Sequence, residues 1–152
     1  IQMANFAATI ANRGFYYTPH LIKAIGKDKK PLPIYMERHY TTIDSAHFRI
    51  AADAMEQVVQ EGTGQYRAKL QDIIVCGKTG TVENDPHPAH AVFIAFAPKD
   101  NPKIAISVYV EDAGQGARAA ASIASLMIEK YLIGQTKRPH IEQYVLNGKF
   151  LD

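Results

Sequence analysis

Three parts of the chain repeat apolar residues at the three- and four-residue spacing that predicts amphipathic helices. The first covers residues 2–13 and stops at Gly14, the second begins at residue 45 and stops at Gly62 and Gly64, and the third covers residues 117–132. The apolar positions of the first two helices are Met3, Phe6, Ala7, Ile10, Phe48, Ala51, Met55, Val58 and Val59. Two polar residues are candidate N-caps of the second helix, Asp44 and Ser45.

Runs of β-branched and aromatic residues predict strands between the second and third helices. Residues 91–97 and 103–110 form an antiparallel hairpin with a tight reversal at 98–102, and a shorter strand is expected at 73–76. The other segments are predicted to be extended chain at 15–25 and 32–42, an exposed basic turn at 27–30, a polar connection at 64–72, and loops at 84–90 and 111–116. This order of elements favours an α+β fold, an antiparallel sheet packed by helices.

The bulk composition narrows the class of protein. The chain has 152 residues, of which 47% are hydrophobic and 21% charged, so it can bury a substantial core. A net charge of +2 gives no basic surface typical of nucleic-acid binding, and no apolar run approaches the length of a membrane span. The chain opens at Ile1 inside a helical pattern with no preceding cap, so we expect it to be part of a longer protein.

The stretch VCGKTGTVEN, residues 75–84, suggests two different chemistries. A phosphate-binding loop would need a glycine at position 72, which is Asp72, and a helix after the motif. The four residues between Asp72 and Gly77 predict a strand, and prolines follow soon after, so the phosphate-loop interpretation fails. The other interpretation is a Lys-Thr-Gly-Thr motif on a strand, residues 78–81, which belongs to serine enzymes that react with β-lactams.

The segments around the motif support the second interpretation. QMANFAATIANRG with TPHLI, MEQVVQEGTG, CGKTGTVEN, HAVFIAFAPKDNPKIAISVYVE and AASIASLMIEKYL stand in that order along the chain. Together they resemble the C-terminal part of the transpeptidase domain of a class B penicillin-binding protein, of the elongation type and similar to Bacteroidetes members. The resemblance covers residues 1–133, and we assign residues 134–152 to a C-terminal tail. It implies a partial penicillin-binding-protein or serine β-lactamase-like fold, with the last three strands of the sheet.

The resemblance also implies a role for each motif residue. Lys78 supplies positive potential at one wall of the active site, and the hydroxyls of Thr79 and Thr81 bind the terminal carboxylate of a peptidoglycan stem peptide or of a β-lactam. Gly80 lets the substrate lie against the strand, and the Thr81 N–H is one of two oxyanion-hole donors. No cofactor is implied. The parent protein is expected in the inner membrane with this domain in the periplasm.

Two of the three family motifs are missing from the sequence. The chain has four serines, and none of them begins an S-x-x-K or an S-x-N motif; they are Ser45, Ser107, Ser122 and Ser125. In the family these motifs lie upstream of the segment that Ile1 begins. We therefore predict that the chain alone neither catalyses transpeptidation nor reacts with penicillin, and that it needs the N-terminal part of its own domain as a partner.

The absent upstream strands leave an expected open edge on the strand at 103–110. An apolar edge strand is a template for pairing with another chain. We therefore expect a homodimer through this edge, or recruitment of one of the chain's own segments to it.

Other residues allow alternative interpretations. His87 and His90 with Glu83 and Asp85 suggest a metal site, but they lie in a proline-rich segment without a ligand framework, so a plain loop is the preferred interpretation and no metal is expected. The single cysteine, Cys76, is expected to be a buried structural thiol. Two other functions stay open: a β-lactam sensor or β-lactamase-like domain on the same fold, and a non-catalytic α+β binding module.

Overall fold

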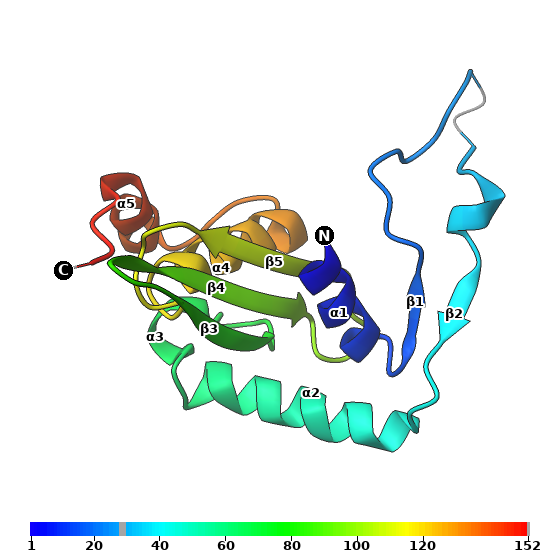
Figure 1. Cartoon of the computed structure of the whole chain (residues 1–152), viewed down its shortest axis with the longest axis horizontal. Helices are drawn as coiled ribbons and strands as arrows, with labels where there is room; N and C mark the ends of the chain where they lie inside the picture. The colour runs from blue at the N-terminus through cyan, green and yellow to red at the C-terminus, as the bar shows by residue number, and fades with distance from the viewer. Residues whose placement is uncertain (28–29, 152) are drawn as a thin grey trace.

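The computed structural model describes residues 1–27 and 30–151. Its elements in chain order are α1 (Gln2–Ala11), β1 (Phe15–Tyr17), the 3-10 helix η1 (Pro33–Tyr35), β2 (Arg38–Tyr40), α2 (Ser45–Gln60), α3 (Gln65–Ala68), β3 (Cys76–Asn84), β4 (His87–Ala97), β5 (Ile104–Val110), α4 (Ala119–Ile133) and α5 (Pro139–Asn147). The three longest strands form one antiparallel sheet, and helices pack against it (Figure 1). The predicted α+β class is confirmed.

The central sheet has the strand order β3-β4-β5. The predicted hairpin is confirmed, because β4 pairs with β5 in antiparallel register, with Phe93 opposite Val108. The strand β3 pairs with the other side of β4, with Gly80 opposite Val92. Within the described part of the chain, the outer sides of β3 and β5 are therefore the two edges of the sheet.

Successive side chains of β4 point to opposite faces of the sheet and pack into two separate hydrophobic cores. Phe93 and Ala95 are fully buried in a cluster that includes Ala120, Ala124 and Ile128 of α4. The alternate residues Ile94 and Phe96 point to the opposite face and pack with α1 and α2. The side chains of α4 nearest the sheet are small, which lets the helix approach the strands closely.

The helix α2 begins as one of the two predicted caps requires. The Asp44 carboxylate accepts a hydrogen bond of 2.7 Å from the Ala46 N–H, so Asp44 is the N-cap and Ser45 is the first helical residue. The buried stripe of the helix is Phe48, Ala52, Met55 and Val59. Ala51 and Val58, which the spacing also predicts to be buried, are only half-buried.

A two-stranded arm extends from the body of the protein (Figure 1). Phe15 of β1 pairs with Tyr40 of β2, and the described segments 18–27 and 30–37 between them run far out from the sheet. The segment 32–42 is extended as predicted only in part, because Pro33–Tyr35 forms a 3-10 turn with a proline at its start. The predicted basic turn includes residues 28 and 29, which lie outside the described residues.

Two strand boundaries differ from the prediction. Residues 73–75 are not a strand: Val75 is buried by packing, and Ile74 makes a single backbone contact, accepting from the Lys99 N–H over 2.9 Å. The ladder begins at Cys76 and runs through the whole Lys-Thr-Gly-Thr motif. Of the four residues in the apolar run at 73–76, only Cys76 therefore pairs in the sheet, although Val75 is also fully buried.

The predicted loop at 84–90 is also wrong. The strand β3 continues to Asn84 and β4 begins at His87, so only Asp85 and Pro86 form the turn, and the peptide bond between them is cis. Pro88 is accommodated in β4 because this end of the strand extends past the last residue that pairs with β5.

Two short helices lie in segments without a predicted structure. The four residues of α3 interrupt the polar connection, and a segment this short shows no helical periodicity. The tail contains α5, whose Ile141 is buried, and Phe150 packs against the core on the α4 side. The boundary between residues 133 and 134 stays a prediction.

One arginine joins the tail to the body. The Arg138 guanidinium lies 3.1 Å from the Glu129 carboxylate of α4. It also donates to the Arg67 carbonyl over 3.1 Å and to the Ser125 hydroxyl over 3.0 Å. Glu129 is only 4% exposed, so Arg138 neutralises a buried charge.

Candidate active-site wall

The Lys-Thr-Gly-Thr motif lies in the middle of β3, on one edge of the sheet. Lys78 stands opposite Ile94, Thr79 opposite Phe93, and Thr81 opposite Ala91. Because neighbouring side chains of a strand alternate, Lys78 and Gly80 share the α1/α2 face, while Thr79 and Thr81 share the α4 face. The motif thus offers polar groups on both sides of one open edge.

The motif side chains contact only a few neighbours. The Lys78 ammonium is exposed and donates to the Thr79 carbonyl over 2.7 Å. The Thr79 hydroxyl lies 2.8 Å from the hydroxyl of Thr63, which comes from the turn between α2 and α3. Thr81 is exposed. The structure therefore brings all four predicted residues, Lys78 to Thr81, onto one accessible strip, while their binding role stays a prediction.

Sequence reasoning did not identify two residues that shape this strip. Thr63 orients the Thr79 hydroxyl, and its only signal was its place in the family-like stretch MEQVVQEGTG. Gly77 lies directly under the Phe93 ring, because a Cβ added there would overlap three ring atoms, two of them at 3.0 Å. A single sequence cannot reveal this contact, since it depends on the β3–β4 register.

The position of Gly116 shows which backbone groups of β3 point toward β4 and which point toward the open edge. A Cβ added to Gly116 would lie within 3.0 Å of the carbonyl oxygens of both Gly80 and Val92. Both carbonyls therefore point into the β3–β4 ladder, where each accepts from the N–H of the opposite residue. Backbone groups alternate along an antiparallel strand, so the N–H of Thr81 faces the opposite side, the open edge of β3.

The same alternation sets the backbone of β5. Since Val92 exchanges its hydrogen bonds with β3, the next residue, Phe93, exchanges its bonds with Val108. The N–H groups of Ser107 and Tyr109 then point away from β4, along the open edge. Both edges of the sheet thus present unpaired donors within the described residues.

Two of the four serines are engaged elsewhere. Ser122 and Ser125 of α4 are fully buried and donate their hydroxyls to the backbone carbonyls of Arg118 and Arg67. Neither hydroxyl is presented to solvent or to the motif edge, so neither is a candidate nucleophile.

Cys76 and the two histidines of β4 lie outside the Lys-Thr-Gly-Thr motif. Cys76 is fully buried, as predicted, and this burial, followed by the negative charge of Glu56, raises the pKa of its thiol from 9.0 to about 12. His90 accepts a hydrogen bond of 3.1 Å at Nδ1 from the Asp112 N–H, which holds it to the loop after β5. Among the described residues, no three His, Cys, Asp or Glu side chains gather into a metal-binding group.

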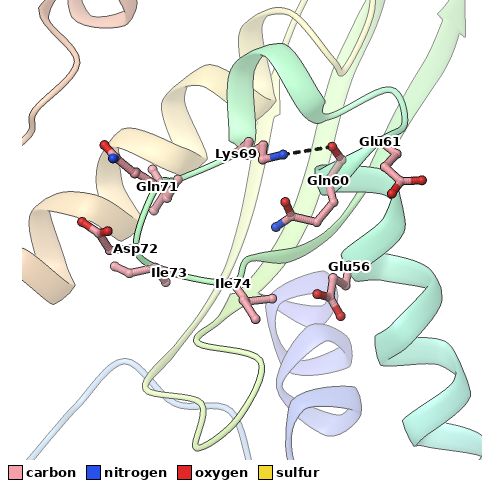
Figure 2. Close-up of a pocket in the computed structure, with 9 residues that line it drawn as sticks. Glu56, Gln60, Glu61, Lys69, Gln71, Asp72, Ile73 and Ile74 are labelled. Carbon is pink, nitrogen blue, oxygen red and sulfur yellow. Dashed lines mark hydrogen bonds between the residues drawn. The ribbon is translucent and has the colours of Figure 1, made fainter.

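A pocket of about 760 Å³ lies between the end of α2 and the segment 69–74 (Figure 2). Its lining is mixed in charge, and Lys69 donates to the Gln60 carbonyl across it over 3.4 Å. The lining residues are Glu56, Gln60, Glu61, Lys69, Leu70, Gln71, Asp72, Ile73 and Ile74. None of them belongs to the motif, so the pocket is separate from the candidate wall.

Residues 1–129 match the family model described as the penicillin-binding protein transpeptidase domain. The chain belongs to this family. Among curated relatives, the peptidoglycan D,D-transpeptidase MrdA of Haemophilus influenzae is 32% identical over an alignment 165 residues long. The alignment covers 95% of this chain and 25% of that protein. The chain therefore spans about a quarter of the length of this relative.

Solved structures of penicillin-binding proteins show the same fold. The structure of Pseudomonas aeruginosa PBP2 superposes with a TM-score of 0.75 at 32% identity, over 92% of this chain and 31% of that one. Penicillin-binding protein A of Mycobacterium tuberculosis, solved as an imipenem acyl-enzyme complex, gives a TM-score of 0.69 at 32% identity, over 85% of this chain and 29% of that one. The predicted fold, an antiparallel three-stranded sheet packed by helices as in this transpeptidase family, is confirmed.

The match extends to the class of penicillin-binding protein. The chain is part of a class B transpeptidase domain similar to the MrdA and PbpA proteins. No helix among the described residues combines the length and apolarity that crossing a lipid bilayer requires.

Proposed function

We propose that this chain forms the Lys-Thr-Gly-Thr wall of a serine D,D-transpeptidase active site that cross-links peptidoglycan stem peptides. The observation that carries the proposal is the position of the motif. Lys78 to Thr81 run along an open strand edge, in a chain that belongs to the transpeptidase family. Such an edge can bind an extended peptide, because unpaired backbone groups and flanking side chains both face the ligand.

Each motif residue has a separate task in the proposed reaction. A serine oxygen from outside this chain attacks the carbonyl carbon of the stem-peptide bond between two D-alanines, and the C–N bond then breaks as the terminal D-alanine leaves with a proton. The positive charge of Lys78 favours this proton transfer. The hydroxyls of Thr79 and Thr81 hold the terminal carboxylate, and the Thr81 N–H stabilises the negative oxygen.

The hydrogen bond between Thr63 and Thr79 supports this assignment. A threonine hydroxyl rotates freely unless a partner fixes it, and only a fixed donor is preorganised for a carboxylate. If the Thr79 hydroxyl accepts from Thr63, its own hydrogen is free to point at the ligand.

The same acyl-transfer chemistry predicts reaction with β-lactams, whose carboxylate resembles that of the stem peptide. The structure of the M. tuberculosis relative is an imipenem acyl-enzyme complex, which shows this reaction for that protein. For the present chain we propose an elongation-type branch similar to Bacteroidetes members. We also propose an inner-membrane parent protein with this domain in the periplasm.

The experiment compares two proteins with a fluorescent penicillin. The chain of residues 1–152 should not be labelled, because none of its four serines begins an S-x-x-K or S-x-N motif. The longer natural protein that contains the chain should be labelled covalently, and excess unlabelled penicillin should prevent this. Absence of label on the longer, folded protein would contradict the proposal.

We further propose that the open edge of β5 pairs with another strand. In the longer protein this strand comes from the upstream part of the same domain, and in the isolated chain it comes from a second copy. An apolar depression of about 400 Å³ lies beside this edge, lined by Ile104, Leu126, Met127, Lys130 and Tyr131. None of the described segments adds a strand to this edge, so none of them supplies the pairing strand.

Sedimentation of the isolated chain tests this pairing. Because the Tyr109 N–H points outward, Tyr109→Pro removes one edge donor while leaving the β4–β5 bonds in place, and we expect the dimer to weaken about tenfold or more. The matched control is Tyr109→Thr, which removes the same ring but keeps the N–H and suits a strand. A monomeric wild-type chain, or equal weakening by both variants, would count against edge pairing.

A further inference from the structure

The loop between β5 and α4, residues 111–118, lies across one face of the sheet and is tied to the β3–β4 hairpin. The Gly114 N–H donates to the Ala89 carbonyl over 2.7 Å. The Asn84 side chain donates to the Asp112 carboxylate over 2.9 Å, and the Asp112 N–H donates to His90. Three hydrogen bonds thus fix the loop to the far end of β3 and β4.

At its closest point the loop touches the backbone behind the motif. A Cβ at Gly116 would lie 3.0 Å from the Gly80 nitrogen and closer still to the oxygens of Gly80 and Val92. Contacts under 3.0 Å are not found for real Cβ atoms, and backbone atoms of a paired ladder cannot move aside as a flexible side chain can. No side chain fits at this position without moving either the strand or the loop.

The need for glycine at this position is a need for space. Gly114, two residues earlier, has a φ of +72°, which favours glycine for conformational reasons. Gly116 has no such φ, so its backbone conformation is open to any residue. What excludes other residues is the close approach to Gly80. The Gly116 carbonyl also accepts from the Ala121 N–H over 3.0 Å, which joins the contact to the first turn of α4.

The contact with Gly116 involves the peptide group between Gly80 and Thr81. One side of this group is the Gly80 carbonyl, which faces Gly116 and Val92. The other side is the Thr81 N–H, which faces the open edge where the substrate is proposed to bind. Because a peptide group is planar and rigid, any displacement of the Gly80 oxygen moves the Thr81 N–H as well.

We propose that Gly116 is a positioning residue, which holds the Gly80–Thr81 peptide from behind and so fixes the Thr81 N–H as an oxyanion-hole donor. This inference rests on the proposed transpeptidase function. Oxyanion stabilisation depends on donors within about 2.7–3.1 Å of the developing charge. A shift of a few tenths of an ångström therefore slows acylation more than it weakens binding of the intact ligand.

The kinetic test is made on the longer natural protein that contains this chain. We expect Gly116→Ala to lower the rate constant of acylation by penicillin about tenfold or more, with less than a twofold change in the dissociation constant of the noncovalent complex. The matched control is Gly134→Ala. Gly134 ends α4 at a φ of +84° with no atom within 4 Å, so this variant costs stability without touching β3. Equal acylation rates in both variants, or a loss in binding alone, would overturn the inference.

A second measurement is independent of activity and of any variant that fails to fold. Amide hydrogen exchange of the chain, followed by NMR, should show strong protection of the Gly80 and Val92 N–H groups, which the loop covers. The Thr81 N–H should exchange faster, because it faces the open edge. Equal protection of Gly80 and Thr81, or fast exchange of Val92, would overturn the inference. If the longer protein does not react with penicillin at all, the proposed function fails, while this measurement still decides whether the Gly80–Thr81 peptide has the orientation that the inference requires.

Discussion

The two edges of the sheet present different chemistry although both belong to antiparallel strands of one layer. The β3 edge carries an ammonium and two hydroxyls, and the motif leaves its backbone accessible. The β5 edge carries half-buried aliphatic side chains, Ile104, Ile106, Val108 and Val110, which pack on the core. The difference agrees with the two proposals, which place a polar, exchangeable ligand at the β3 edge and permanent cover by protein at the β5 edge.

The largest expected effect is on the β3 edge and concerns reactivity. In the longer natural protein, Lys78→Ala should lower acylation by penicillin about a hundredfold or more, because the positive charge at the wall is lost. The unfolding free energy should change by less than about 0.5 kcal/mol, since the Lys78 side chain is exposed. Labelling rates with a fluorescent penicillin and urea denaturation measure the two quantities.

The matched control for that prediction lies at the other edge. Lys103 is also exposed and stands just before β5, so Lys103→Ala removes the same charge beside the other edge strand. Labelling should stay at the wild-type rate. An equal loss in both variants would mean that overall charge, and not the wall, controls the reaction.

The next effect concerns stability and should be confined to the β5 edge. Ile106→Ala removes aliphatic volume that packs against the α4 core, and we expect a loss of about 2 kcal/mol in the unfolding free energy. Thr81→Ala on the β3 edge should change it by less than about 0.5 kcal/mol, because Thr81 is exposed. Urea denaturation of the isolated chain measures both, and similar losses would remove the distinction between the edges.

A smaller expected effect is the pH dependence of stability caused by Cys76, which lies at the buried start of β3 and not in its exposed motif. The raised pKa of Cys76 means that the protonated thiol favours the folded state. This contribution is intact below about pH 9 and is lost as the pH rises from 9 toward 12. Wild-type protein should therefore lose about 1 kcal/mol more stability than Cys76→Ala between pH 8.5 and 10. If the unfolding free energies of the two proteins changed equally with pH, the predicted effect of burial on the Cys76 thiol would be wrong.

The sequence predicts the parts of the structure whose signal is local. Helical spacing gives α2, and the Asp44 cap fixes its start. Alternating apolar residues with a reversal between them give the β4–β5 hairpin. The motif also makes Lys78 to Thr81 the candidate site residues, because its letters are specific and its flanking segments resemble the family.

The rest depends on contacts between distant segments. Ile73 to Val75 have the composition of a strand, but pairing begins only at Cys76, and of the three residues only Val75 is fully buried. The need for glycine at Gly77 and Gly116 comes from Phe93 and from the Gly80 backbone, which are remote in sequence. The helix α5 is short, and its docking depends on Arg138 meeting Glu129 across the turn after α4.

The three contacts of Arg138 have a practical consequence for expressing shorter versions of the protein. A chain cut after residue 133 would keep Glu129 but lose its cation, and the Ser125 hydroxyl and the Arg67 carbonyl would each lose a donor. A buried carboxylate without a partner is costly, so such a fragment should be prone to proteolysis and aggregation. A soluble recombinant domain should therefore include Arg138, and it should extend through Phe150 because that ring packs against the core.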